Sequence, residues 1–391
     1  MSPSHATRIL FAILAIAFFA TPVTARMVGI TAEAFENRRF AEAPKPSQGW
    51  DAFQQTTRFL TDRMPLRAQA VRANTRIWQD LFDTDPRYSR QTTLADDQAL
   101  PFTGQTEDDD GGSRPATASQ VLSGKDRWLF LTGELSNACT PPLPFDEVLR
   151  RWADLVAVVR ASGRRAVVLV APDKASVYPE FLPDEFSGDE CALAGKRALW
   201  DLLEQRGPGL GVVPLRERLL RAKRRGDDLV YLRRDSHWNA LGALEPLRAV
   251  LDRFGGAVRI APGELRPSSA SEYRGDLTAL LGATDTDTQP GLSLVREPDA
   301  RRVPGDTLLL GDSYGELSVP KMVPYFEALR APVWVGTPAK QLMDEIAGAD
   351  LVIFETVERD IGYRVSDAGP ASPAFTAALR RHLMRSPASK R

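Results

Sequence analysis

The stretch "DTLLLGDSYGE" (residues 306–316) decides how the second half of this chain folds. Its three consecutive leucines are typical of a buried strand, and Gly311 permits a tight turn directly after them. A helix can begin at Ser313, which would place the serine hydroxyl at a sheet edge, beside the N–H groups of the first helical turn. The same residues are also typical of a helix capped by Asp312 or Ser313, so this stretch alone does not identify a catalytic serine.

Apolar segments alternate with amphipathic helical segments on both sides of this stretch. Continuous apolar strands separated by helices indicate a mostly parallel sheet that is covered by helices on both faces, a three-layer α/β fold. The pattern predicts strands over residues 126–133, 165–174, 209–215, 227–232, 306–313, 331–336 and 351–356. It predicts helices over residues 146–163, 195–207, 216–226, 239–255, 314–330, 340–350 and from about 371 onward.

Polar side chains follow three of these predicted strands. The segments are "APDKASVYPEFLP" (residues 171–183), "RRDSHW" (residues 233–238) and "GDSYGE" (residues 311–316). Binding and catalytic sites of open parallel sheets lie at the carboxyl ends of the strands. We therefore expect these three segments to meet at one edge of the sheet.

His237 is the single histidine in the middle of the chain, because His5 lies in the apolar N-terminal stretch and His382 in the charged tail. In an extended segment, Asp235 and His237 point to the same face. A serine nucleophile needs a base, and the base needs an acid that orients it. The alternative is a structural histidine beside a helix-capping aspartate. A metal site needs more ligands than the sequence offers here, so no metal is expected.

The composition bounds the class of protein. The 391 residues are 43% apolar and carry a net charge of −1, from 50 basic and 51 acidic side chains. A chain of this length and apolarity can build one large α/β domain. The balanced charge gives no sign of a nucleic-acid partner.

The N-terminus predicts export. Residues 9–20 form an apolar run that follows Arg8 and precedes small residues, as in a secretory signal. Residues 1–25 are thus a signal peptide or a retained N-terminal anchor, and the remaining residues lie outside the cytoplasm. Cys139 and Cys191 are the two cysteines, which favours one disulfide in an oxidising compartment over two separate buried thiols.

The domain organisation is predicted to be simple. Residues 26–391 read as one domain, interrupted near residues 91–120 by a polar and acidic segment typical of a surface loop.

Several motifs together resemble one known group, the alginate O-acetyltransferase AlgJ/AlgX family of SGNH hydrolase-like proteins. "GDSY" resembles the SGNH nucleophile block, and an Asp-x-His-Trp motif ahead of Gly-Asp-Ser matches the order of motifs in this family. "GKDRWLFLTGE", "APDKASVYPEFLP", "YRGDLTALL" and "ETVERDI" also have counterparts, although Arg127 replaces the usual glycine. "FENRRFAEAPKP" and "FLTDRMPLRAQAVRAN" resemble the N-terminal region of the family. The resemblance covers residues 30–365 apart from the acidic segment.

The resemblance implies an SGNH/GDSL-like fold and a periplasmic O-acetyltransferase of an alginate-like exopolysaccharide. Ser313 would be the nucleophile, His237 the general base and Asp235 the residue that orients His237. The acetyl group would be relayed by a membrane-bound O-acyltransferase partner alongside other polysaccharide-modification proteins, without a cofactor. Two rival functions stay open: a carbohydrate acetylesterase with the same three residues, and a non-catalytic scaffold of a biosynthetic complex.

Further residues are candidates for contact with the oxyanion or the substrate. They are Gly311, Tyr314, Lys174, Tyr178 and Arg274, each beside one of the motifs, and each also has a structural alternative as a packing or loop residue. Glu358 and Arg359 are expected to form an exposed ion pair.

Overall fold

A computed structural model describes residues 121–225, 229–281, 283–297 and 300–385, together with Thr21 and Thr24. Residues 121–277 and 286–385 belong to one compact unit, and residues 278–285 fall outside it. The expected leader and the acidic segment near residues 91–120 lie outside the described residues, apart from the two threonines, and the single-domain organisation stays a prediction. Within the described part of the chain, no helix has the length and apolarity needed to cross a membrane.

A parallel sheet of five strands forms the centre of the unit, which confirms the predicted fold class. The strand order is β4-β3-β9-β7-β8, and every neighbouring pair is parallel. The register pairs Val167 with Ile353 and Leu310 with Phe354, so that β9 lies between β3 and β7. The strands are β3 (Arg165–Ala171), β4 (Val212–Pro214), β7 (Val303–Leu310), β8 (Phe326–Arg330) and β9 (Leu351–Val357).

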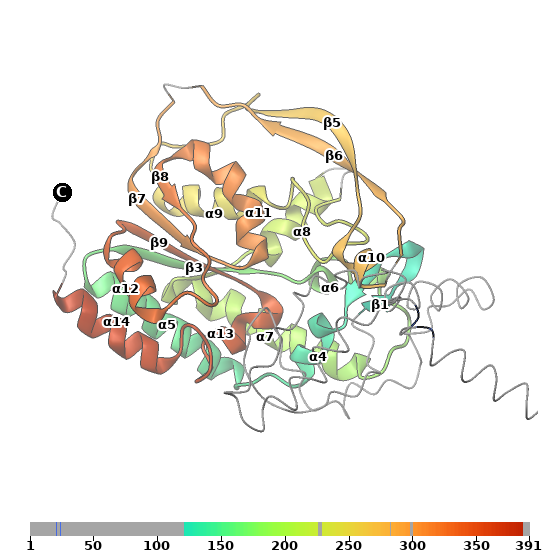
Figure 1. Ribbon diagram of the computed structural model, residues 1–391, viewed down its shortest axis with the longest axis horizontal. Coiled ribbons are helices and arrows are strands. Elements are labelled where there is room, and N and C mark those ends of the chain that lie inside the picture. The colour runs from blue at the N-terminus through green and yellow to red at the C-terminus, as the bar shows by residue number, and fades with distance from the viewer. Residues whose placement is uncertain are drawn as a thin grey trace, which may run out of the picture. The chain divides into compact units, whose positions relative to one another are not determined.

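Helices cover both faces of this sheet, as Figure 1 shows. On one side are α5 (Phe145–Ala161), α7 (Asp189–Leu210), α12 (Ala339–Ala347) and α14 (Pro373–Arg385). On the other side are α9 (Leu244–Phe254) and α11 (Ser313–Met322), which contact each other. Shorter helices are α4 (Gly133–Cys139), α6 (Lys174–Val177), α8 (Arg216–Arg225), α10 (Asp276–Leu280) and α13 (Ile361–Arg364), with 3-10 turns at Lys125–Arg127, Pro179–Phe181, Val323–Tyr325 and Glu358–Asp360.

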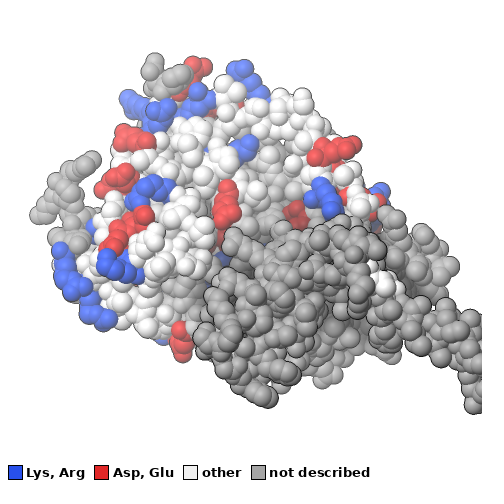
Figure 2. Space-filling model, viewed as in Figure 1, with Lys and Arg blue, Asp and Glu red and all other residues white. Residues whose placement is uncertain are grey.

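The two faces of the sheet are set by the alternation of side chains along each strand. Val168, Leu308 and Phe354 belong to the apolar core that includes residues of α5, α7, α12 and α14, where the ring of Trp152 meets that of Trp334 edge-on at 6.0 Å between centroids. The strand residues that alternate with these face α9 and α11. Figure 2 shows basic and acidic side chains interspersed over the described surface in that view, as the near-zero net charge suggests.

Two hairpins contain strands that were not expected from the sequence, and the short helices α4, α6, α10 and α13 were not expected either. β1 (Val121–Ser123) pairs with β2 (Leu129–Leu131), and β5 (Leu265–Tyr273) pairs with β6 (Asp287–Leu294), both antiparallel. Most of β5 is exposed and lacks large apolar residues, so the sequence carries no strand signal there. Helix α4 holds Cys139, which forms the expected disulfide with Cys191 of α7 at a Cα–Cα distance of 5.2 Å.

The strand predicted over residues 227–232 is not part of the sheet, which corrects the sequence-based interpretation. Tyr231 and Trp238 instead form an isolated antiparallel bridge, and the chain folds back between them. The N–H of Leu232 donates to the carbonyl of His237 at 3.2 Å, and the N–H of Asn239 to the carbonyl of Val230 at 3.0 Å. The buried residues of this segment thus pack in a short turn, and we call residues 230–239 the base loop.

The helix predicted over residues 314–330 is also too long. It ends at Met322, and residues 326–330 form the edge strand β8, while the strand predicted over residues 331–336 is irregular. Pro324 has no N–H for an α-helical hydrogen bond, and α11 is followed by a 3-10 turn at Val323–Tyr325. The apolar character of residues 331–336 reflects Trp334, which is buried in the core beneath the sheet.

Candidate functional site

Ser313 lies at the turn between β7 and α11, as the sequence predicted. β7 ends at Leu310, and α11 begins at Ser313 itself. Asp312 is the N-cap of α11, because its Oδ1 accepts a hydrogen bond from the N–H of Tyr314 at 3.0 Å. Ser313 is exposed, so the capping interpretation and the presentation of a serine hydroxyl hold together in one turn.

The base loop brings His237 to Ser313. Nε2 of His237 lies 2.8 Å from Oγ of Ser313, and Nδ1 of His237 lies 2.7 Å from Oδ1 of Asp235. The N–H of His237 also donates to Oδ1 of Asp235 at 2.9 Å. Asp235 and His237 meet because the loop turns back around the aspartate, not because they share one face of a strand. The three residues form a continuous chain of hydrogen bonds, in the geometry that nucleophilic catalysis requires.

A second carboxylate, Asp276, lies near the same nitrogen of the imidazole ring as Asp235. Its Oδ2 is 3.6 Å from Nδ1 of His237 and accepts the hydroxyl of Ser236 at 2.5 Å. Its N–H donates to Oδ2 of Asp235 at 2.9 Å. Asp276 lies within "YRGDLTALL", and the sequence gave no signal that it would face the histidine.

These two carboxylates set the protonation of the histidine. Burial on its own would lower the pKa of His237, but its hydrogen bond to Asp235, the charge of Asp235 and the charge of Asp276 together raise that pKa above the usual range. Burial acts to raise the pKa of Asp235, yet its hydrogen bonds to His237 and Asp276 lower it overall. Asp235 is therefore ionised at neutral pH and favours the His237 tautomer that has its proton on Nδ1.

The backbone N–H groups around Ser313 are mostly used within the turn. Those of Asp312 and Gly315 donate to Oε2 of Glu355 at 3.1 and 3.0 Å, and that of Tyr314 donates to Asp312. No acceptor among the described residues binds the N–H of Ser313. Sequence reasoning expected several neighbouring N–H groups to stabilise an oxyanion, and the structure leaves that of Ser313 for this task.

Three of the candidates for contact with the oxyanion or the substrate are buried, which favours their structural alternative. Lys174 and Tyr314 are 0% exposed and Tyr178 is 1% exposed. The hydroxyl of Tyr314 donates to the carbonyl of Ser236 at 2.5 Å, and the hydroxyl of Tyr178 accepts from the N–H of Val230 at 2.9 Å. Both tyrosines therefore bind the backbone of the base loop from the interior of the protein.

Lys174 supports the same loop with its ammonium group. Nζ donates to the carbonyls of Leu232, Arg233 and Asp235 at 3.2, 3.1 and 2.5 Å. Burial lowers the pKa of Lys174 to about 8, although nearby carboxylates, among them that of Asp276, act in the opposite direction. Lys174, at the start of α6 after β3, thus binds the segment that carries Asp235.

The two remaining candidates, Gly311 and Arg274, are not buried. Gly311 is partly exposed at the turn after β7, where a Cβ atom would lie 2.9 Å from Oε2 of Glu355. Arg274 is exposed and directly precedes Gly275, whose Cα faces the backbone of Arg234 and Asp235. A contact of Arg274 with substrate stays a prediction.

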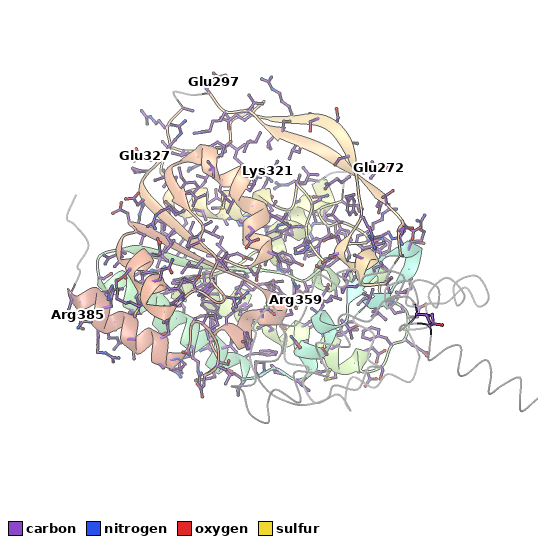
Figure 3. The ribbon with its side chains drawn as sticks, viewed as in Figure 1. Glu272, Glu297, Lys321, Glu327, Arg359 and Arg385 are labelled. Atoms are coloured by element: carbon purple, nitrogen blue, oxygen red, sulfur yellow. A yellow bond between two sulfur atoms is a disulfide. The ribbon has the colours of Figure 1, made fainter. Side chains whose placement is uncertain are left out.

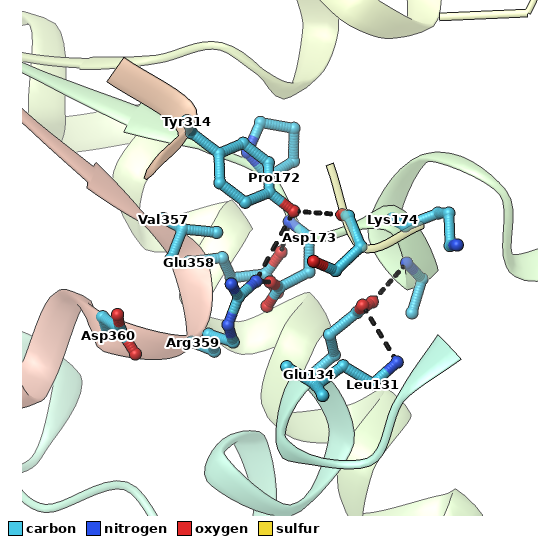
Figure 4. A network of polar contacts seen from close by, with 12 residues as sticks. Leu131, Glu134, Pro172, Asp173, Lys174, Tyr314, Val357, Glu358, Arg359 and Asp360 are labelled. Atoms are coloured by element: carbon cyan, nitrogen blue, oxygen red, sulfur yellow. Dashed lines mark hydrogen bonds and ion pairs between the residues drawn. The ribbon is translucent and has the colours of Figure 1, made fainter. Parts of the chain in front are cut away.

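A buried charged network lies behind the site, shown in Figure 4. Nη1 of Arg359 donates to Asp173 at 2.6 Å and lies 3.5 Å from the hydroxyl of Tyr314. Glu358 accepts from the ammonium of Lys196 at 2.8 Å. Figure 3 shows Arg359 in the interior, so the expected exposed ion pair of Glu358 and Arg359 is wrong. Nothing in the local sequence distinguishes these residues from surface charges.

Asp235, His237 and Asp276 also place three ligand atoms within 4.8 Å of one another, the one such group among the described residues. Three protein ligands suffice for a catalytic zinc ion. Here the atoms are engaged with one another and with Ser236, as hydrogen-bond partners. That no metal takes part stays a prediction.

Comparisons with known proteins identify the family to which this chain is similar. A family model described as "SGNH hydrolase-like domain, acetyltransferase AlgX" matches residues 121–316. The probable alginate O-acetylase AlgJ of Pseudomonas aeruginosa is 35% identical over 145 residues, which are 36% of this chain and 33% of that protein. The chain therefore spans about a third of the length of this curated relative.

Two solved structures are similar to this chain. The O-acetyltransferase domain of Pseudomonas putida AlgJ has 20% identity and a TM-score of 0.46, covering 67% of this chain and 98% of that one. Pseudomonas aeruginosa AlgX has 15% identity and a TM-score of 0.45, covering 67% and 65%. Since the family model matches about half of the chain, including Asp235, His237 and Ser313, the chain belongs to the AlgX family of SGNH hydrolase-like acetyltransferases.

Proposed function

We propose that this protein is a periplasmic O-acetyltransferase that acetylates hydroxyl groups of an alginate-like exopolysaccharide through an acetyl-enzyme intermediate. The observation that carries the proposal is the unbroken chain of hydrogen bonds from Ser313 through His237 to Asp235. Membership of the acetyltransferase family and the alginate-related name of the curated relative support the reaction and the acceptor class. The disulfide supports an oxidising compartment.

The reaction has two matched halves. His237 Nε2 takes the proton of Ser313 as Oγ attacks the acetyl carbonyl of the donor, and the same proton passes to the departing donor group. A sugar hydroxyl then gives its proton to Nε2 while its oxygen attacks the acetyl-serine. Collapse of this second intermediate returns the proton to Ser313 and leaves the acetyl ester on the sugar. The N–H of Ser313 would stabilise the oxyanion in both halves.

The acetyl donor in the cell would be presented by a membrane-bound O-acyltransferase. The exposed hydroxyl of Ser313 is compatible with transfer from such a partner, because it needs no dedicated cofactor site. A handover of this kind predicts that the acetyl-enzyme is long-lived until the acceptor binds, since water must be kept from hydrolysing it.

The test is acetyl transfer in vitro. Purified protein is incubated with p-nitrophenyl acetate, with and without oligouronates, and the products are analysed by mass spectrometry. Acetylated sugar is expected for the wild type, and none for Ser313→Ala or His237→Ala. His382→Ala is the matched control, because His382 also pairs with an aspartate, Asp344, at 3.2 Å. Free acetate alone would favour the acetylesterase, and no turnover by wild type would favour the scaffold.

A further inference from the structure

Glu355 is a fully buried carboxyl group in the central strand of the sheet. The register that pairs Leu310 with Phe354 brings Glu355 alongside Gly311, on the face that α11 covers. Burying a carboxyl group is costly unless its polar atoms are bound. Apart from Thr356, the rest of this central strand is apolar and would be more stable with an aliphatic residue here, so the position of Glu355 suggests a functional reason.

The carboxyl group of Glu355 binds the turn that carries Ser313. Its Oε2 accepts from the N–H groups of Asp312 and Gly315, which flank Ser313 in the chain. A Cβ atom at Gly311 or Gly315 would lie 2.9 or 2.8 Å from Oε2, closer than real Cβ contacts come. The two glycines of the motif therefore leave room for this carboxyl group under the turn.

The surroundings of Glu355 favour its neutral form. Burial, the negative charge of Asp312 and a hydrogen bond with that side chain raise the pKa of Glu355 well above its usual range, and Arg364 opposes this only in part. Among the described residues no donor binds Oε1 of Glu355. Asp312 has its own donors, the N–H of Val357 at 2.8 Å and Arg364 at 3.5 Å. One negative charge, not two, thus lies beneath the point where the oxyanion forms.

We propose that Glu355 is a positioning residue for the acylation of Ser313. Its neutral carboxyl group binds the N–H groups on both sides of Ser313 and so holds the turn with the N–H of Ser313 available to the oxyanion. The proposal rests on the proposed function, in which Ser313 is acetylated. It is distinct from the roles of His237 and Asp235, because Glu355 acts through the backbone and touches no reacting atom.

The experiment compares three substitutions in the full chain. Glu355→Gln keeps an oxygen that accepts both N–H bonds and adds an amide that can donate to Asp312. Glu355→Leu has a similar volume and can do neither. Glu327→Leu is the matched control, since Glu327 is an exposed carboxylate of the same sheet that accepts the N–H of Gly305 at 2.9 Å. The readouts are the acylation rate of Ser313 by p-nitrophenyl acetate, the rate of its labelling by an aryl sulfonyl fluoride, and Tm.

Glu355→Leu is expected to slow both reactions of Ser313 roughly 10²-fold through loss of orientation, with the loss in kcat and not in KM. Glu355→Gln should react at a rate close to wild type, and Glu327→Leu likewise. Wild-type rates for Glu355→Leu would overturn the proposal. Equal loss of rate in Glu355→Gln and Glu355→Leu would also overturn it, because the acceptor oxygen that Gln keeps would then make no difference.

Gly315→Ala tests the proposal if Glu355→Leu does not fold. The added Cβ displaces Oε2 of Glu355, while alanine suits a helix better than glycine does. Slow labelling of Ser313 with a Tm near wild type is expected, and labelling at the wild-type rate would contradict the role of Glu355. If the sulfonyl fluoride does not label Ser313 in the wild type at all, both the proposed function and this inference fail. If it labels wild type and all variants alike, only the inference fails.

Discussion

At the scale of the residue, the site depends on two carboxylates that lie beside one nitrogen of the His237 imidazole. Asp235 binds Nδ1 of His237 directly, and Asp276 lies 3.6 Å from the same atom. A base of this kind works only when neutral, so the charges that orient it also set the pH at which it becomes active.

Asp276→Asn should shift the pH dependence of acylation. The charges of Asp235 and Asp276 raise the pKa of His237, so wild-type activity falls as the pH drops through a value above the usual range for histidine. Without one charge the pKa falls, and the acidic limb of kcat/KM should move to lower pH by about 0.5 to 1 unit. The pH profile of p-nitrophenyl acetate turnover checks this. Asp344→Asn, beside His382, should leave the profile in place, and an unmoved limb in Asp276→Asn would count against the role of that residue.

Lys174→Met should lower activity by about 10-fold or more, since three carbonyls of the base loop lose their common donor. It should also change how stability depends on pH. Between about pH 8 and 10 the unfolded lysine holds a proton that the folded lysine does not, so this group makes wild type more stable as the pH rises. Urea unfolding should show the stability gap between wild type and variant widening by up to about 1.4 kcal/mol per pH unit in that window.

The exposed Lys340→Met is the control for that comparison, because Lys340 pairs with Asp344 on the surface of α12. Its stability gap from wild type should stay constant between pH 8 and 10. A constant gap for Lys174→Met as well would show that this lysine keeps its proton in the folded state.

At the scale of the element, the regular strands and helices were the predictable part. Continuous apolar runs such as residues 166–171 and 351–354 are buried on both faces, and this pattern is a strong strand signal. The base loop was mistaken for a strand because residues 229–232 are apolar, yet their burial comes from side chains behind the loop. β5 was missed since an exposed hairpin strand of small and polar residues lacks an apolar pattern.

The candidate site also has residues that the sequence predicts and residues that it does not. Ser313, His237 and Asp235 are chemically distinctive and were found by their type and order. Asp276 and Glu355 are ordinary acidic residues in the sequence, and only the fold places them against His237 and the Ser313 turn. Lys174 was chosen for a strand end that faces substrate, but a fully buried lysine turned inward to three carbonyls leaves no local signature.

Gly275→Ala should disrupt the junction between the base loop and the segment that carries Asp276. A Cβ at Gly275 would lie 1.9 Å from the carbonyl oxygen of Arg234, which is backbone and must move. Acylation is expected to fall roughly 10²-fold as Asp235 shifts. Gly209→Ala is the control, since its Cβ meets nothing within 4 Å, and it should be neutral or slightly stabilising. Equal activity of both variants would rule out a tight junction at Gly275.

At the scale of the whole molecule, one covalent link fastens α4 to α7. The disulfide joins residues 52 positions apart, so reduction should cost about 2–4 kcal/mol of unfolding free energy. Guanidinium unfolding with and without a reductant measures this. The Cys139→Ser/Cys191→Ser variant should start at the lower stability and show no further response to reductant, and a response in that variant would point to another cause.

His237 lies outside the parallel sheet, whereas Ser313 directly follows one of its strands, so the segments that carry the two residues should differ in mobility. Ser313 follows a strand that pairs with β9 over residues 307–310, whereas the base loop has one bridge, one backbone hydrogen bond from Leu129 to the carbonyl of Arg233, and contacts from side chains. Such a loop can open without the sheet. Amides of residues 230–239 should therefore exchange with deuterium sooner than those of β9. Mild denaturant should abolish the acylation of Ser313 while the sheet is still folded.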